Sequence, residues 1–476
     1  MTKLFFYIFL FSGISFANEL PDLGDYSETI IGAHEEAIIG SQILQQVQQS
    51  DTVIHDVEIE DYLYSLTNKL VRSSDYSGSG LTFFLVNDSS INAFAMLGGV
   101  IGIHTGLILS ANSESELASV LSHEIAHITQ RHIARLVSKL QKDSFKSYLG
   151  LGLALLLARS NPELAKGALM ASQALGVQTI LDFTRDNEKE ADRVGIKILH
   201  KAGFDTRGSI DFFKTLQKGN PYSAGTATSF LRTHPITSER ISDIENRLAE
   251  YPYKQRLDDP SFHFVKAKIK VSLQDKKSII KQLKTSIKNK SYLSELGERY
   301  ALTYAYLLNE NFKEAEREIK WLKNKNIKNP MIDQLEIKIL IKKRDINAAY
   351  KSIKKALKKY PNYRAFVYEL ANYLIETKSE KEAIKFLQSY VRIYKTDSEL
   401  YKLLAKAYSL NGKKLLQYES LAESFYYRYN LQEAIVQMDM AVRASDGNFY
   451  EKSRVESRLK KMQKEKEIYD ISKANL

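Results

Sequence analysis

The sequence predicts a predominantly helical α+β protein, with a small sheet in its first half and an all-α repeat solenoid in its second. Apolar residues recur at helical spacing along most of the chain, strand patterns lie between residues 81 and 104, and small residues recur every 34 positions after residue 300. The 476 residues are enough for two or three domains. We expect a signal peptide at 1–17, one domain at 18–255 and the solenoid at 256–476.

Residues 1–17 have the features of a secretory signal peptide. Lys3 precedes the apolar run 4–11, and Ser15 and Ala17 stand three and one positions before a cleavage site after Ala17. The apolar run is too short to cross a bilayer, although a retained N-terminal anchor is the alternative. In a Gram-negative cell the mature protein would be periplasmic.

Charge divides the chain into two parts. Residues 1–250 contain 21 basic and 29 acidic residues, whereas residues 251–476 contain 47 and 28. The basic half lacks an RNA-binding signature, so nucleic acid is not expected, and acidic proteins or a peripheral contact with an anionic membrane fit it better. The absence of cysteine excludes disulfides and thiolate metal sites, so any metal must be bound by His, Asp or Glu.

The first domain begins with helix patterns at 31–47 and 57–73, followed by a strand at 81–86 and a turn at 87–90. Residues 93–104, which include a glycine pair, predict a strand or hairpin. The segment 92–96 is the candidate edge strand that would pair with an extended substrate; ordinary sheet structure is the alternative.

Residues 117–135 contain no glycine or proline and predict an amphipathic helix. His123 and His127 lie one turn apart on one face, so both imidazoles can bind a single ion. Glu124 lies about a quarter-turn away, where it can reach a water on that ion. Zinc lowers the pKa of a bound water to roughly 7, and Glu124 would take its proton. The same five-residue pattern also occurs by chance.

A second helix pattern at 185–193 supplies acidic groups. Glu188 and Asp192 are four residues apart on one face. Glu188 can be the third protein ligand of one zinc ion per chain, and Asp192 could orient a histidine of the first helix. The alternative, a solvated acidic face, is the interpretation we give to Glu190.

His234, followed by Pro235, has two possible roles. It could donate to the oxyanion of the reaction, or occupy the open metal position and displace the catalytic water. Arg240, six residues later, would neutralise developing charge or pair with Glu239 or Glu245. His132 falls about 180° round the first helix from His123 and is expected to face away from the metal.

The apolar segment 145–183 separates the two ligand-bearing helices. A buried helical hairpin is the simpler interpretation. The alternatives are a mobile cover over the metal cleft and a surface that contacts membrane or an unfolded client.

The second half has an internal period. Ala315, Ala349 and Ala383 are separated by two steps of 34, and Ala371 and Ala405 by one. This period resembles tetratricopeptide repeats, whose concave surface binds partner proteins; a generic helical bundle is the alternative. The step from Ala383 to Ala434 is 51, which predicts an irregular helix pair near 410–427, with capping helices before 300 and after 445.

These motifs together resemble the zinc metallopeptidases that include the CAAX prenyl proteases and a heat-shock protease, and the layout is similar to their periplasmic branch of β-barrel assembly proteases. The resemblance rests on His123-Glu124 with His127, on Glu188 with Asp192, and on His234 with Arg240, and is supported by 20–24, 91–95 and 98–99. It implies a zincin-like metallopeptidase domain in which His123, His127 and Glu188 bind zinc, Glu124 is the base, and His234 keeps the site latent.

The expected function is that of a periplasmic zinc endopeptidase, and association with the outer membrane is a further expectation. The resemblance implies misassembled outer-membrane β-barrel proteins as clients, assistance to their assembly, and the barrel-insertion machinery as a partner of the repeats. The alternatives are a non-proteolytic chaperone or scaffold that acts through the repeats, and a cytosolic peptidase that retains residues 1–17.

Overall fold

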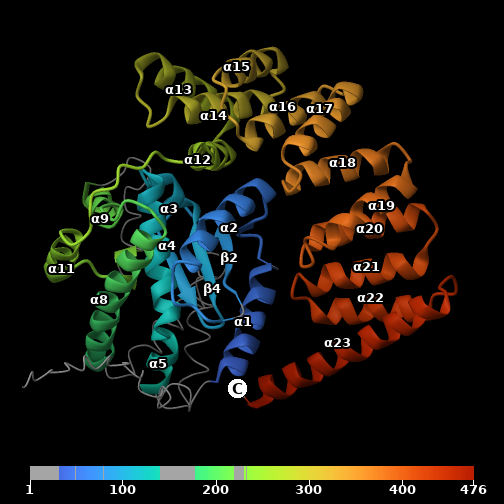
Figure 1. The fold of residues 1–476 in the computed structure, drawn as a ribbon, viewed down its shortest axis with the longest axis horizontal. Helices are drawn as coiled ribbons and strands as arrows, with labels where there is room; N and C mark the ends of the chain where they lie inside the picture. Colours follow the sequence, from blue (N-terminus) through green and yellow to red (C-terminus); the bar gives the residue numbers. More distant parts are fainter. Residues whose placement is uncertain are drawn as a thin grey trace, which may run out of the picture.

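The computed structural model describes residues 32–48, 50–78, 80–139, 177–218, 230–231 and 233–475. Its first part contains a small sheet and the helices that surround it (Figure 1). These elements are α1 (Ala33–Gln48), β1 (Val53–Ile54), α2 (Val57–Val71), β2 (Thr82–Val86), β3 (Ala93–Met96), β4 (Val100–His104), α3 (Thr105–Ser110), α4 (Glu114–Thr129), α5 (His132–Lys139), α8 (Val177–Lys201), α9 (Gly208–Lys218) and α11 (Ser238–Leu248). The expected signal peptide 1–17 and residues 145–176 of the apolar segment lie outside the described residues.

The sheet has the strand order β1-β2-β4-β3. β2 and β4 are parallel, whereas β1 pairs with β2 and β3 pairs with β4 in antiparallel fashion. The β3–β4 hairpin turns through Gly98 and Gly99, which have φ values of 77° and 73°, a backbone conformation that favours glycine. β3 is therefore an edge strand, as the candidate segment 92–96 required.

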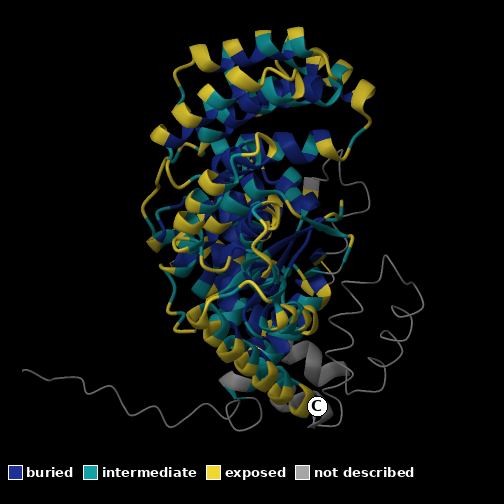
Figure 2. Ribbon diagram, turned by 90° about the vertical axis from the view of Figure 1, so that its right-hand side faces the viewer, coloured by how far each residue is buried: buried dark blue, intermediate teal, exposed yellow. Residues whose placement is uncertain are grey.

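Alternate residues of the strands face two different cores. Leu85 and Ile101 pack with α2 and α4, whereas Phe84 and Val100 pack with α1. The larger core continues without a break into the first repeat helices, where it includes Phe264 and Ile339. Figure 2 shows this buried material running from the sheet into the helices above it. The first repeats and the sheet domain thus share one hydrophobic core.

The second part consists of helix pairs, which confirms the predicted fold class. In chain order the pairs are α12 (Pro260–Ser272) with α13 (Lys276–Asn289), α14 (Glu295–Leu308) with α15 (Phe312–Asn324), α16 (Pro330–Lys342) with α17 (Ile346–Lys359), α18 (Arg364–Glu376) with α19 (Glu380–Val391), α20 (Ser398–Leu410) with α21 (Lys414–Tyr426), and α22 (Leu431–Arg443) with α23 (Phe449–Asn475). From α14 onward consecutive helices pack against each other, whereas α12 and α13 both pack mainly against α14. The predicted domain boundary at 255/256 falls between α11 and α12.

The irregular helix pair predicted near 410–427 is wrong. Helices α16, α18 and α20 begin at 330, 364 and 398, and α22 begins at 431, so the period continues. What changes is the position of the buried small residue within the helix. Helix α21 buries Ala422 near its C-terminal end, and α22 buries Ala434 near its N-terminal end. The alanine that permits close helix packing therefore lies at a different position along α21, while the regular succession of paired helices continues.

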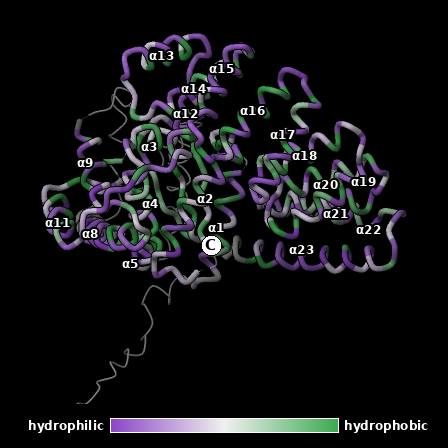
Figure 3. Tube along the Cα trace, turned by 45° about the horizontal axis from the view of Figure 1, so that its top comes forward, coloured by the Kyte–Doolittle hydropathy of each residue, from purple (hydrophilic) through white to green (hydrophobic). Residues whose placement is uncertain are grey.

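The array arcs over the sheet domain and returns to it. The last helix, α23, runs back toward α1, and the described C-terminal end lies beside that helix (Figures 1 and 3). Tyr469 of α23 donates a hydrogen bond of 3.3 Å to Gln45 of α1, and Tyr429 packs against the α1 core. No helix in the described part of the chain is long and apolar enough to cross a membrane.

Acidic residues at the start of α2 anchor the basic array. Buried Glu58 accepts from Lys268 at 2.5 Å, from Lys338 at 3.1 Å and from Tyr363 at 3.1 Å. Arg364 of α18 pairs with Asp61 at 2.6 Å. Burial opposes the charge of Lys268, but Glu58 and Asp56 raise its pKa above the usual value, so Lys268 is charged at neutral pH. Some basic residues of the second half therefore form ion pairs with acidic residues of the first half.

We expect Lys268→Met to destabilise the protein by roughly 3 kcal/mol, because it leaves the buried Glu58 carboxylate with weaker compensation. The midpoint of urea unfolding should fall accordingly. Lys338→Met is the matched control: Lys338 is 32% exposed and contacts the same oxygen, so its loss should cost about 1 kcal/mol or less. Equal effects of the two substitutions would contradict the assignment of Lys268 as the main partner.

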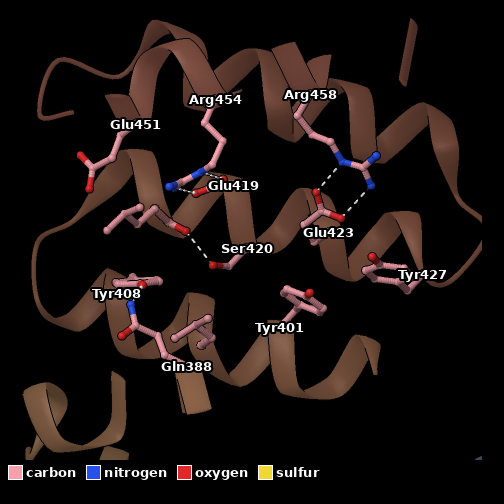
Figure 4. Close-up of a pocket in the computed structure, with 12 residues that line it drawn as sticks. Gln388, Tyr401, Tyr408, Glu419, Ser420, Glu423, Tyr427, Glu451, Arg454 and Arg458 are labelled. Carbon is pink, nitrogen blue, oxygen red and sulfur yellow. Dashed lines mark hydrogen bonds and ion pairs between the residues drawn. The ribbon is translucent and has the colours of Figure 1, made fainter. Parts of the chain in front are cut away.

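A cavity of about 460 Å³ lies in the distal half of the array (Figure 4). Tyr401 and Tyr408 of α20 line it, and two ion pairs bridge α21 and α23 beside it. Arg454 pairs with Glu419 at 2.6 Å, and Arg458 pairs with Glu423 at 2.7 Å. Both arginines of α23 thus form ion pairs with carboxylates of α21.

Candidate metal centre

The predicted helix that carries the HExxH motif begins at a well-formed cap. The side chain of Ser113 accepts a hydrogen bond from the Glu116 backbone N–H, and α4 runs to Thr129. Every residue from Glu114 to Ala126 is buried. His123, Glu124 and His127 therefore stand on a rigid helix in the middle of the domain.

Helix α8 packs closely against α4 and brings Glu188 to the two histidines. A Cβ atom at Gly195 would lie 3.2 Å from the His123 backbone, so glycine permits this approach. Glu188 Oε2 lies 3.3 Å from His123 Nε2, and Glu188 Oε1 lies 3.3 Å from His127 Nε2. The two Nε2 atoms are 3.0 Å apart. The tertiary structure thus brings together groups that are about 60 residues apart in sequence.

His234 completes this group. Its Nδ1 lies 3.0 Å from Glu188 Oε1 and 3.3 Å from His123 Nε2. One donor atom from each of His123, His127, Glu188 and His234 lies within 4.8 Å of the other three, a set able to hold a metal ion. On the other side, His234 Nε2 lies 3.4 Å from Glu124 Oε1. His234 therefore sits between the candidate ligands and the candidate base.

Asp192 and Arg240 contact the His123 and Glu188 side chains of the cluster. Asp192 Oδ1 lies 3.0 Å from His123 Nδ1, the ring nitrogen that points away from the cluster. Arg240 donates to both oxygens of Asp192, at 2.7 and 2.8 Å, and lies 2.9 Å from Glu188 Oε2. The prediction that Arg240 pairs with Glu239 or Glu245 is wrong, because the Arg240 side chain is buried against α8. It also donates to the Pro235 carbonyl, which ties the His234 loop to α8.

The predicted orientation of His132 is also wrong. The helix expected over 117–135 ends at Thr129, Arg131 adopts a φ of 50°, and α5 begins at His132. This break turns His132 back, so its Nδ1 lies 2.8 Å from His127 Nδ1. Its Nε2 lies 3.1 Å from Glu190, which also pairs with Arg135 at 2.6 Å. Since neither Gly nor Pro marks residues 129–132, no local signal indicated the break.

His132 therefore occupies the same position behind His127 that Asp192 occupies behind His123. We expect His132→Ala to weaken metal retention by about 10- to 100-fold, the usual loss when a group that orients a ligand is removed. Competition with a chelator measures it, and His132→Asn should recover part of the loss because it restores a hydrogen-bonding group. His200→Ala is the matched control, since the His200 ring contacts that of Tyr251, with centroids 4.6 Å apart, and is not among the four grouped donor residues. Unchanged metal retention in His132→Ala would contradict this assignment.

Glu124 is buried between the cluster and the edge strand. Burial raises its carboxyl pKa; the charges of His234 and His123 and a backbone hydrogen bond from Ala95 of β3 oppose this shift, while the neighbouring Glu188 adds to it. Glu124 Oε1 has no hydrogen-bond partner among the described residues. Because the His234 ring lies 3.4 Å from this oxygen, a water or a substrate group can reach it only when that ring moves.

The donor set fits a divalent metal of the zinc type. It consists of imidazole nitrogens and one carboxylate in a buried site, and the chain has no cysteine. Burial lowers the pKa of His127 to about 3, so this imidazole is neutral. Burial likewise opposes the charge of His123, but Glu188 and Asp192 raise its pKa to about 10. A positive charge is thus favoured at the centre of the cluster.

Comparisons with known proteins identify both parts of the chain. Residues 59–248 match the model of peptidase family M48, and residues 340–407 match a tetratricopeptide repeat model. The chain is 39% identical over 251 residues to a "Putative beta-barrel assembly-enhancing protease" of Vibrio cholerae, an alignment that covers 53% of this chain and 52% of that protein. It is 28% identical to the "Beta-barrel assembly-enhancing protease" of Yersinia pestis, over 94% of this chain and 92% of that one. The corresponding Escherichia coli K12 protein is 29% identical, over 88% and 86%. The chain is therefore a metallopeptidase in which residues 59–248 are similar to peptidase family M48 and are followed by tetratricopeptide repeats.

Proposed function

We propose that this protein is a zinc-dependent endopeptidase in which His123, His127 and Glu188 hold the metal. Zinc would act as a Lewis acid that lowers the pKa of a bound water to about 7. Glu124 accepts the proton of the attacking water and returns it to the leaving amine. Asp192 and His132 keep the ligand histidines oriented through their Nδ1 atoms, and Arg240 holds Asp192 and Glu188 in place.

The observation that carries this proposal is the convergence of the two imidazoles and the Glu188 carboxylate, with the Glu124 carboxylate beside them. The edge strand β3 adjoins the same helix, where it can add an extended peptide through backbone hydrogen bonds. Such pairing favours unfolded or extended substrates.

His234 is proposed to hold the site latent. Its Nδ1 lies within 3.0 to 3.3 Å of Glu188 and His123 and its Nε2 lies near Glu124, so its ring fills the space that a substrate carbonyl and a water need. The competing role, donation to the oxyanion, requires the His234 ring to move away from Glu188. Arg240 links the Pro235 carbonyl to Asp192, which offers a physical restraint on that movement.

The proposed clients are misassembled outer-membrane β-barrel proteins, and the proposed partner of the repeats is the machinery that inserts them. Support comes from the names of the relatives aligned over most of the chain. The proposed location is the periplasm, after cleavage following Ala17. N-terminal sequencing of the protein recovered from a periplasmic fraction tests the location; a retained residue 1 in the cytoplasm would contradict it.

Removal and return of the metal tests the proposed chemistry. We expect a strong chelator to abolish cleavage of an unfolded barrel protein and to lower the thermal unfolding midpoint, because a ligand bound only to the native state stabilises it. One equivalent of zinc should restore both. Cleavage that persists after metal analysis shows no bound ion would contradict the proposal.

A further inference from the structure

The outer helices of the first three repeat pairs expose one sign of charge. Each of α13, α15 and α17 buries one stripe of its surface, for example Ile279 and Leu283 on α13. The opposite stripe of α13 faces solvent and is basic, with the exposed lysines Lys276, Lys277, Lys281, Lys284 and Lys288. In Figure 1 the three helices follow the upper rim of the molecule, on the side away from the sheet.

The same pattern continues on the next two outer helices. Helix α15 exposes Lys313, Arg317, Lys320 and Lys323, and helix α17 exposes Lys351, Lys354, Lys355, Lys358 and Lys359. Helices α13 and α17 contain no acidic residue, and the acidic residues of α15, Glu314, Glu316 and Glu318, are buried or partly buried. The exposed carboxylates nearest in sequence, Asp275, Glu310 and Asp345, lie in the turns that precede the helices. We name the exposed basic residues of these three helices the basic outer face.

Few of these charges are neutralised within the protein. Of the basic outer face, only Lys323 and Lys359 lie within 4.0 Å of a carboxylate in the described structure, on Glu336 and Asp333. The distal outer helices differ. Exposed Glu382 interrupts the lysines of α19, and Glu419 and Glu423 of α21 are paired with arginines of α23 (Figure 4). Solubility alone does not require lysines to gather on one face without acidic residues, because unpaired like charges repel one another.

We propose that the basic outer face is a docking surface for an anionic lipid membrane. All but one of its residues are lysines, which protein–protein interfaces disfavour, while arginine is the residue that recognises nucleic-acid phosphates through paired hydrogen bonds. Lysines spread over three neighbouring helices suit a broad, laterally mobile layer of headgroups, where each contributes attraction without a fixed register. Docking through this face leaves the metal site on the opposite side of the array free for substrate.

Vesicle sedimentation with the full-length mature protein tests this. We expect binding to phosphatidylcholine vesicles that contain phosphatidylglycerol, little binding to phosphatidylcholine alone, and loss of binding near 1 M salt, where the Debye length is about 3 Å. The triple variant Lys351→Glu, Lys355→Glu and Lys358→Glu should bind at least about tenfold more weakly. The matched control is Lys381→Glu, Lys385→Glu and Lys406→Glu, which changes the net charge equally on exposed lysines of α19 and α20.

The outcomes separate the proposal from its alternatives. Retained binding of the control variant together with loss in the α17 variant supports the basic outer face. Equal losses would show that only total charge matters, and would overturn it. So would binding that ignores phosphatidylglycerol, or a polynucleotide that binds more tightly than vesicles at equal phosphate concentration. Unchanged peptide cleavage and unfolding midpoint verify that the variants are folded, and vesicle binding by Glu124→Gln protein keeps this test independent of the peptidase proposal.

Discussion

Glu124→Gln is expected to reduce peptide cleavage by at least about a hundredfold, the lower end of what a general base contributes. The substitution keeps the shape of the side chain and removes only its capacity to accept a proton. Because Glu124 is not among the four grouped donor residues, bound metal should remain at one equivalent. The unfolding midpoint should stay equal or rise, since burial already disfavours the charged form of this carboxyl.

The matched control is Glu239→Gln, which changes an exposed carboxylate on α11 that pairs only with Lys189 in the described structure. It should retain full activity. Activity in Glu124→Gln at the native level would remove Glu124 from the proposed mechanism. In cells, a Glu124→Gln protein that still supports barrel assembly would assign that cellular role to the repeats, which is the scaffold alternative.

His234→Ala is expected to raise cleavage of an unfolded substrate by about tenfold or more. In the structure the ring of His234 lies against Glu188, His123 and Glu124. On the latent-state proposal, the site is open only in the fraction of molecules in which this ring has moved. If the closed arrangement is favoured by about 1.4 kcal/mol, its removal raises the competent fraction about tenfold. Initial rates at low substrate concentration, compared at equal metal content, measure this.

A fall in activity of similar size would instead assign His234 to oxyanion stabilisation, and would overturn the latent-state proposal. The double variant His234→Ala with Glu124→Gln should be inactive, which shows that any gain arises at the same site. His263→Ala is the matched control, because His263 lies on α12 beside Asp258 at 3.5 Å and is not among the four grouped donor residues.

Local patterns were sufficient for most of the fold. Helical spacing located α1, α2 and α4 within two or three residues of their starts, and alternation located β2 and the β3–β4 hairpin. Two steps of 34 residues predicted tetratricopeptide repeats, which the family model confirms. The predicted irregular pair failed because the alanine that permits close packing can move along a helix without changing helix length.

The sequence by itself determined the chemistry available to this protein: two imidazoles one turn apart, a carboxylate beside them, and a second helix with two more, since these follow from spacing along a helix. Only the tertiary structure decided how they combine. The left-handed Arg131 turns His132 onto His127, Gly195 lets α8 approach α4, and the burial of Arg240 against Asp192 replaces the surface pairs that its neighbours suggested. These contacts depend on the direction in which one helix leaves another, a property set by packing between distant segments and absent from any local repeat.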